Sequence, residues 1–152
     1  MQNNILQSLY PPEQIFITGY AFDDINLGIT VTCCVPEGTQ YSAPPIPYVT
    51  AENYVRCLSQ ACYLLAEHIL DQRLLAVDMD VAVFRRAAVE WEIFYRNLAM
   101  TFHQRVTKGA PFEMRFTLKN WKEIRRLEDF LLFTFTNART VISGEMTFVF
   151  KG

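Results

Sequence analysis

The sequence predicts an α+β domain in which antiparallel strands pack against one long helix. The helix is indicated by residues 49–70, where apolar side chains recur at intervals of three and four and therefore share one helical face. A strand is indicated most clearly by residues 112–118, where apolar and polar side chains alternate strictly. Most other apolar runs are rich in β-branched and aromatic residues, which are typical of strands. This order of elements predicts a sheet wrapped around the helix.

The long helix is expected to begin at Thr50, whose hydroxyl suits an N-cap position. Glu52 and Asn53 follow in the first turn, where free N–H groups and the helix dipole favour acidic and amide side chains. Many residues of the apolar face are small, which suits a helix whose backbone lies close to a sheet. The small residues are Ala51, Cys57, Ala61, Cys62 and Ala66. The opposite, polar face carries Glu52, Arg56, Gln60, Tyr63 and Glu67.

Short elements are predicted before the long helix. Residues 5–10 suit a lead-in helix or turn, which the two following prolines stop. Residues 14–22 and 27–35 are β-branched and aromatic runs separated by Asp and Asn, which predicts a hairpin. Residues 36–47 contain too much proline and glycine for a strand, so we expect a loop that leads into the long helix.

After the long helix, Asp78 or Asp80 is expected to cap a second, shorter helix that runs toward Trp91. Further strands are predicted at residues 93–106, 112–118, 130–135 and 141–150. The first of these strands needs a bulge near Asn97, because its alternation of apolar residues slips there. Residues 121–128 are charged and suit either a helical turn or the twisted middle of a long hairpin, and we favour the hairpin.

The composition describes one globular domain that spans residues 1–152. With 51% hydrophobic and 20% charged residues, the chain is able to bury a core. A formal net charge of -2 provides no basic field, so neither nucleic acid nor a membrane is expected as a partner. The chain has no recognisable secretory signal and no apolar run of membrane-spanning length, so we expect a cytoplasmic protein.

The cysteines and histidines do not predict a metal site. Four cysteines stand at positions 33, 34, 57 and 62, without CxxC spacing and without histidines at metal-ligand spacing. We expect reduced cysteines that pack as small apolar residues, and neither a metal nor another cofactor. His68 and His103 are expected to be structural or to lie at the surface, because nothing in the sequence brings either close to Thr50.

Four stretches of the sequence resemble a known family. They are ILQSLYPP, GTQYSAPPIPYVTAENYVRCLSQACYLLA, GAPFEMRFT and ISGEMTFVF. Together they are similar to the FcoT-like acyl thioesterases of the hotdog superfamily, over nearly the whole chain. The resemblance implies a curled antiparallel sheet around one long central helix, a dimer, and a thioester of coenzyme A or acyl carrier protein as the partner.

The resemblance also implies a set of site residues without a serine, cysteine or histidine nucleophile. Tyrosines of the family are matched by Tyr10 and, with a shift of one residue, by Tyr41. A family histidine falls on Tyr48, and two family asparagines fall on Thr50 and Ser59. From the residues alone, Tyr48 is either a site residue or a hydrophobic staple, and Ser59 is either a substrate contact or bonded to its own helix backbone.

The start of the long helix suits a thioester carbonyl on physical grounds, because that oxygen gains negative charge when the carbonyl is attacked. The backbone N–H groups of Ala51, Glu52 and Asn53 are expected to bind the substrate there. Glu52 is either a general base or a solvated acid that complements the helix dipole.

Three functions remain open. The first is hydrolysis of an acyl thioester, with the carbonyl polarised at the start of the long helix. The second is addition to, or dehydration of, an enoyl or hydroxyacyl thioester on a carrier protein. The third is a non-catalytic module that binds acyl thioesters, favoured by the two replaced asparagines. A homo-oligomer, most simply a dimer, is expected because long strands leave an exposed edge and an apolar helix needs cover.

Overall fold

The computed structural model describes residues 4–39, 43–90, 92–125, 129–137 and 140–151. Its elements are α1 (Ile5–Leu9), the 3-10 helix η1 (Pro12–Gln14), β1 (Ile17–Asp23), β2 (Gly28–Cys33), α2 (Ala51–Asp71), α3 (Val81–Val89), β3 (Ile93–Phe102), β4 (Phe112–Arg125), β5 (Asp129–Asn137) and β6 (Ile142–Lys151). None of the described helices is long and apolar enough to cross a membrane.

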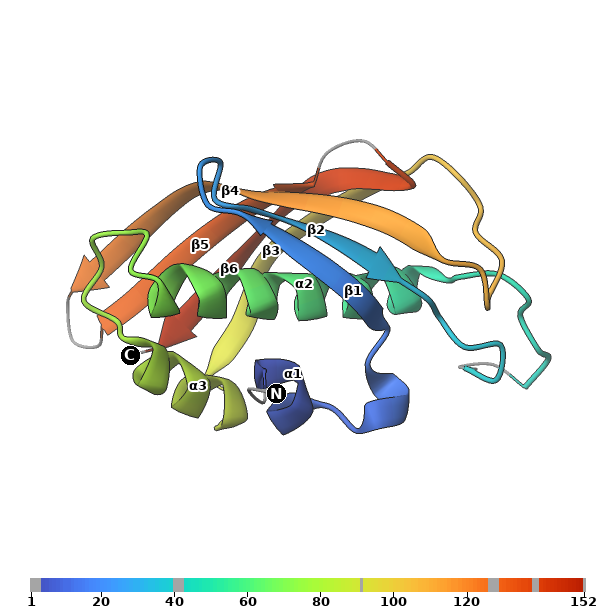
Figure 1. The fold of residues 1–152 in the computed structure, drawn as a ribbon, viewed down its shortest axis with the longest axis horizontal. Coiled ribbons are helices and arrows are strands. Elements are labelled where there is room, and N and C mark those ends of the chain that lie inside the picture. The colour runs from blue at the N-terminus through green and yellow to red at the C-terminus, as the bar shows by residue number, and fades with distance from the viewer. Residues whose placement is uncertain (1–3, 40–42, 91, 126–128, 138–139, 152) are drawn as a thin grey trace.

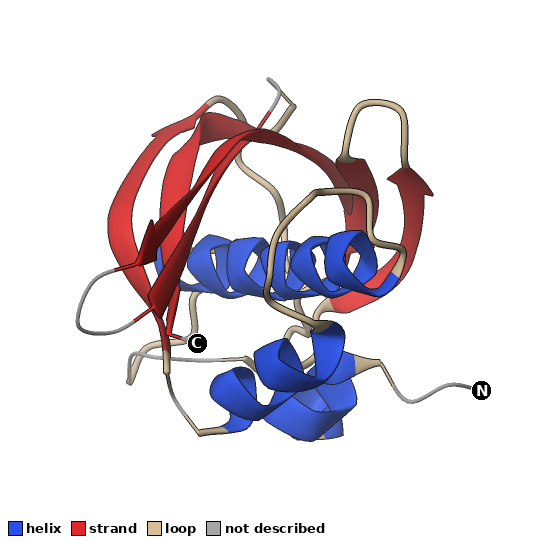
Figure 2. Cartoon of the chain, turned by 90° about the vertical axis from the view of Figure 1, so that its left-hand side faces the viewer, coloured by secondary structure: helices blue, strands red, loops and turns tan. Residues whose placement is uncertain are grey.

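The described strands form one antiparallel, 6-stranded sheet in the order β1-β2-β4-β5-β6-β3. The sheet curls around α2, which lies along its concave face (Figures 1 and 2). Helices α1 and α3 lie on the other side of α2, so the fold has three layers (Figure 1). A curled antiparallel sheet around a central helix is the hotdog arrangement, and the predicted α+β fold class is confirmed.

Helix α2 begins as predicted, with Thr50 as its N-cap. The Thr50 N–H donates to the Asn53 side chain at 3.0 Å, and the Asn53 N–H donates to the Thr50 hydroxyl at 3.5 Å, which is a capping box. Along the inner face, Cys57, Ala61 and Ala66 are completely buried. These small side chains let the helix backbone approach its neighbours closely, as the sequence predicted.

Two residues of the polar face of α2, Gln60 and Glu67, are buried, although Glu52 on the same face is exposed. Gln60 is fully buried because the segment between α1 and β1 covers it. Its side chain accepts a hydrogen bond from Phe16 N–H at 2.9 Å and donates one to the Gln14 carbonyl at 2.7 Å. Gln60 therefore supplies the polar partners that this backbone segment would otherwise lack.

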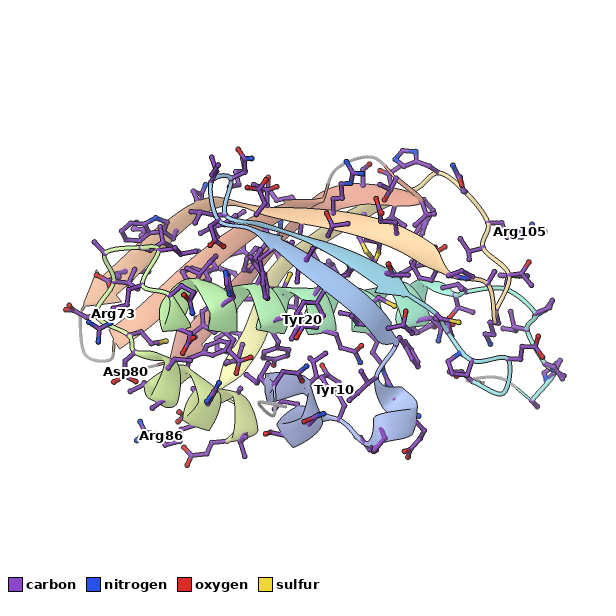
Figure 3. All side chains as sticks on the ribbon, in the orientation of Figure 1. Tyr10, Tyr20, Arg73, Asp80, Arg86 and Arg105 are labelled. Atoms are coloured by element: carbon purple, nitrogen blue, oxygen red, sulfur yellow. The ribbon has the colours of Figure 1, made fainter. Side chains whose placement is uncertain are left out.

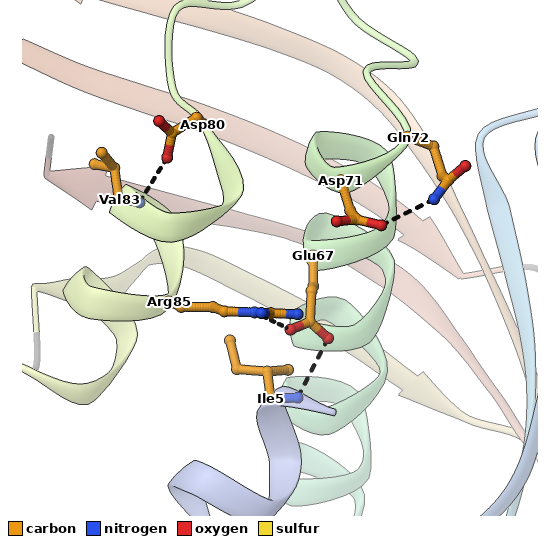
Figure 4. Close-up of polar contacts among 7 residues, drawn as sticks. All are labelled: Ile5, Glu67, Asp71, Gln72, Asp80, Val83 and Arg85. Carbon is orange, nitrogen blue, oxygen red and sulfur yellow. Dashed lines mark hydrogen bonds and ion pairs between the residues drawn. The ribbon is translucent and has the colours of Figure 1, made fainter. Parts of the chain in front are cut away.

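Glu67 is the second buried polar residue of this face, with 8% of its surface exposed. Its carboxylate accepts hydrogen bonds from Ile5 N–H at 3.2 Å and from Arg85 Nε at 2.7 Å (Figure 4). Ile5 begins α1 and Arg85 lies on α3, so one carboxylate connects the three helices. A negative charge also suits the amino end of α1.

Strand β3 carries the predicted bulge but ends earlier than predicted. Its register with β6 slips between Tyr95 and Asn97, where the alternation in the sequence slips. It ends at Phe102 rather than at residue 106. The chain leaves the sheet there because the Val106 carbonyl accepts a hydrogen bond from Val49 N–H at 2.8 Å instead of pairing with β6.

Two other predicted boundaries are settled by the structure. β4 continues to Arg125, which favours the long hairpin over a helical turn; residues 126–128 lie outside the described residues. β1 begins at Ile17 rather than at residue 14, because Gln14 belongs to η1.

Helix α3 is capped by Asp80 rather than by Asp78. The Asp80 side chain accepts a hydrogen bond from Val83 N–H at 2.9 Å. The helix ends at Val89, short of Trp91, which lies outside the described residues.

Candidate functional site

A pocket of about 480 Å³ lies beside the first turn of α2. Its walls include Tyr48, Thr50, Ala51, Tyr54, His103 and Arg105. The space next to the amino end of the helix is therefore open rather than filled by packing. Three residues predicted for the site, Tyr48, Thr50 and Ala51, lie in this one pocket.

Backbone hydrogen bonds hold the two walls of the pocket together. The isolated pairing of Tyr48 with Thr107 is flanked by bonds from Val49 N–H to the Val106 carbonyl at 2.8 Å and from Lys108 N–H to the Pro47 carbonyl at 2.9 Å. The segment that enters α2 is thus fixed against the segment that follows β3. Two stretches far apart in sequence form one rigid rim.

The helix N-terminus offers fewer free donors than the sequence predicted. The Asn53 N–H is bonded to the Thr50 hydroxyl. Hydrogen bonding by its own backbone N–H and by the Thr50 hydroxyl lowers the pKa of the Glu52 carboxyl. The Ala51 N–H has no partner among the described residues. Of the three expected donors, the Asn53 N–H is therefore occupied, and the Ala51 N–H is free at the positive end of the α2 dipole.

His103 also lines this pocket, a position that sequence reasoning missed. Its Nε2 contacts Ser143 Oγ at 2.7 Å, and its backbone N–H donates to the Val141 carbonyl at 2.8 Å. Both contacts come from the chain at the start of β6. No local pattern in the sequence indicates this, because only the curl of the sheet brings His103 to the start of α2.

Tyr48 and Arg105 form the outer rim of the pocket. The Arg105 guanidinium carbon lies 5.0 Å from the centre of the Tyr48 ring, a cation–π arrangement. Tyr48 is 40% exposed, so it contributes a partly open aromatic wall. No local spacing in the sequence pairs these two residues; the Tyr48–Thr107 pairing positions them.

Tyr54 is a second residue of the pocket lining that sequence reasoning did not indicate as a site residue. Only 2% of its surface is exposed. Its hydroxyl is buried and has no hydrogen-bond partner among the described residues. Burial raises the pKa of Tyr54 to about 12, which keeps the phenol protonated at neutral pH.

A second polar group, which we call the tyrosine cluster, comprises Tyr10, Ser59, Tyr63 and Tyr95. Ser59 Oγ donates to the Val55 carbonyl at 2.9 Å and is also hydrogen-bonded to the Tyr95 hydroxyl. Burial raises the pKa of Tyr10, Tyr63 and Tyr95. Neighbouring phenols raise the pKa of Tyr10 and Tyr95 further, and the Cys62 thiol does so for Tyr63. The structure therefore brings Tyr10 and Ser59 together, with neutral phenols around them.

The predicted site residues are divided between these two places. Thr50 and Ser59 are nine residues apart on one helix, a rise of about 13 Å. Figure 3 shows Arg105 on the loop beyond the amino end of α2 and Tyr10 below the middle of that helix. Tyr41 lies outside the described residues.

Two other sets of potentially reactive side chains have structural roles. Cys57 and Cys62 are buried free thiols, and burial raises the pKa of both well above its ordinary value, as expected for packing residues. His68 contacts Asp24 at 2.7 Å and stacks on the Phe22 ring with 3.7 Å between ring centres. It lies in the later half of α2, away from the pocket at the amino end.

No family model and no curated protein matches the sequence. Among solved structures, the chain is similar to the 4-hydroxybenzoyl CoA thioesterase from Pseudomonas sp. strain CBS-3, with 17% sequence identity and a TM-score of 0.46. The match covers 81% of this chain and 84% of that chain.

Proposed function

We propose that the protein binds an acyl thioester of coenzyme A or acyl carrier protein, with the thioester carbonyl in the pocket at the amino end of α2, and hydrolyses it. The observation that carries the proposal is the open pocket of about 480 Å³ that Ala51 and His103 both line, together with an Ala51 N–H that has no partner among the described residues. A single pocket thus offers a donor for the carbonyl oxygen and a group able to accept a proton.

The chemistry assigned to these residues is simple. The Ala51 N–H and the α2 dipole stabilise the negative charge that develops on the carbonyl oxygen. With Nε2 protonated and donating to Ser143 Oγ, His103 has an unprotonated Nδ1 that takes a proton from the attacking water. The carbon–sulfur bond then breaks, and the thiolate takes up a proton to leave as the free thiol.

Arg105 supports a negatively charged carrier for the acyl group. It makes no ion pair with a described residue, and it lies at the rim of the pocket. A free guanidinium suits phosphate groups, which coenzyme A and the phosphopantetheine arm both carry.

The test is release of free thiol from a panel of acyl-coenzyme A substrates of increasing chain length. We expect turnover by the wild type and a loss of about 10²- to 10⁴-fold in kcat for His103→Gln. His68→Gln is the matched control, because that histidine lies away from the pocket and should leave turnover unchanged. Absence of turnover on every chain length, or equal effects of the two substitutions, would refute hydrolysis at this pocket.

A second candidate function, binding without turnover, is favoured by one observation. The Asn53 N–H, in the first turn of α2, already has the Thr50 hydroxyl as its partner, which leaves fewer donors for an oxyanion. Thermal stabilisation by acyl-coenzyme A without release of thiol would select this alternative. Thermal stabilisation accompanied by release of thiol would instead support hydrolysis.

We further propose that two copies associate through the free edge of β3. Among the described strands, β3 pairs only with β6, and the large side chains of Phe94 and Phe102 are 52% and 48% exposed. An unpaired strand edge with exposed aromatic residues is a site for pairing. Light scattering should give the mass of a dimer, and Phe94→Lys should shift it toward the monomer. Ile25→Lys, in the exposed β1–β2 turn, is the control and should not change the mass.

A further inference from the structure

One aromatic wall of the pocket at the start of α2 is open to a ligand. Phe102 lines this pocket at the end of β3, and 48% of its surface is exposed. Its cross-strand partner on β6, Ile142, is fully buried, and residues directly opposite each other in a sheet share one face. The Phe102 side chain therefore lies on the face of the sheet that packs against α2, and much of it is still accessible.

Two buried rings support Phe102 from behind. The centre of the Tyr54 ring lies 5.5 Å from that of Phe102 and 5.4 Å from that of Phe112. Tyr54 and Phe112 are only 2% and 6% exposed, and Phe112 is not among the walls of the pocket. The pocket therefore ends at Tyr54 in this direction, and a ligand inside it meets the exposed surface of Phe102.

The other large aromatic wall is less available to an apolar group. Tyr48 is 40% exposed, but the Arg105 guanidinium carbon lies 5.0 Å from the centre of its ring. No charged side chain of a described residue lies over the Phe102 ring in this way. Phe102 is therefore the exposed ring on which an aliphatic chain can pack without displacing a charged group.

We infer that Phe102 is a specificity-determining residue: the acyl chain packs on its exposed ring, so that aliphatic chains of medium length are preferred over acetyl. This rests on the proposed function, which puts the thioester carbonyl in the same pocket. Complete burial of one methylene group strengthens binding about fourfold. The gain ends where the chain extends past the ring, because the pocket does not continue behind Tyr54.

The test is kcat/KM for release of thiol from the acetyl, butyryl, hexanoyl, octanoyl and decanoyl thioesters of coenzyme A. In the wild type we expect kcat/KM to rise by about tenfold or more from acetyl to hexanoyl and to level off before decanoyl. In Phe102→Ala the rise should shrink to about twofold or less, because the ring that covers the chain is gone. Phe102→Leu keeps part of the apolar surface and should show an intermediate rise.

Phe94→Ala is the matched control. Phe94 lies on the same strand and is 52% exposed, but it does not line the pocket. Both alanine substitutions remove a phenylalanine from the free edge of β3, so an effect that arises from the association of two copies would appear in both variants. Only Phe102→Ala should lose the dependence on chain length.

Thermal stabilisation by the same thioesters keeps this inference separate from the proposed hydrolysis. Stabilisation that increases with chain length in the wild type, and not in Phe102→Ala, supports the inference even where no thiol is released. Release of thiol at equal rates from every chain length, a rise that continues undiminished to decanoyl, or the same dependence in the two alanine variants would overturn it and leave hydrolysis standing.

Discussion

Gln60→Met is the substitution that tests most sharply how α2 is held in this fold. Methionine has nearly the length of glutamine and favours helices, so the change removes two hydrogen bonds without leaving a large cavity. In the wild type these bonds join the side chain to Phe16 N–H at 2.9 Å and to the Gln14 carbonyl at 2.7 Å. Gln60 and Phe16 are both fully buried, so water does not readily replace the lost partner.

The expected magnitude follows from those two backbone groups. A buried N–H left without a partner costs about 1 to 3 kcal/mol, and the partly buried Gln14 carbonyl adds about 1 kcal/mol. We therefore expect Gln60→Met to lower the free energy of unfolding by about 2 to 4 kcal/mol. For a chain of 152 residues, each kcal/mol corresponds to roughly 2 to 4 °C in Tm.

Urea unfolding followed by circular dichroism measures this change. Gln72→Met is the matched control, because the Gln72 side chain is exposed and bonded only to Asp71 at the surface. It should change the free energy of unfolding by less than about 0.5 kcal/mol. If Gln60→Met differed from this control by no more than that amount, the buried position of the segment between α1 and β1 would be wrong.

Three other substitutions test separate parts of the structure. Glu67→Ala leaves the buried Ile5 N–H unpaired and should cost about 2 to 3 kcal/mol in urea unfolding, mostly by loosening α1. Gly144→Ala would place a methyl group against the backbone carbonyl of Ala99, so we expect poor folding, seen as loss of the cooperative thermal transition. Glu52→Gln should lower Tm at neutral pH, because folding lowers the pKa of the Glu52 carboxyl below its ordinary value of 4.5. The carboxylate therefore stabilises the folded protein above that pH, and this contribution is lost as the pH falls. A wild-type Tm that does not converge with the variant's in acid would contradict this last expectation.

Much of the fold could be predicted because its signals are local. The Thr50 cap and the periodicity of α2 identify the central helix, and the slip in alternation near Asn97 identifies the bulge in β3. The environment of Gln60 and Glu67 could not be predicted in the same way. Helical periodicity puts both on the polar face, and only the tertiary position of α1, η1 and α3 shows that this face is covered.

The candidate site was predicted only where its signals in the sequence are local. Thr50 and Ala51 follow from the position of a helix N-terminus, which the sequence marks directly. His103 and Tyr54 could not be assigned to the pocket from the sequence. His103 reaches the pocket only because the sheet curls, and Tyr54 has the spacing of an ordinary core residue. The assignments of Tyr10 and Ser59 to catalysis remain predictions.

The central claim is that the thioester carbonyl lies at the amino end of α2. A crystal structure with a non-hydrolysable thioester analogue, in which a methylene group replaces the sulfur, measures this directly. We expect a carbonyl oxygen about 2.7 to 3.2 Å from the Ala51 nitrogen. An analogue whose carbonyl lies instead among Tyr10, Ser59 and Tyr95, with the pocket beside Ala51 empty, would contradict it.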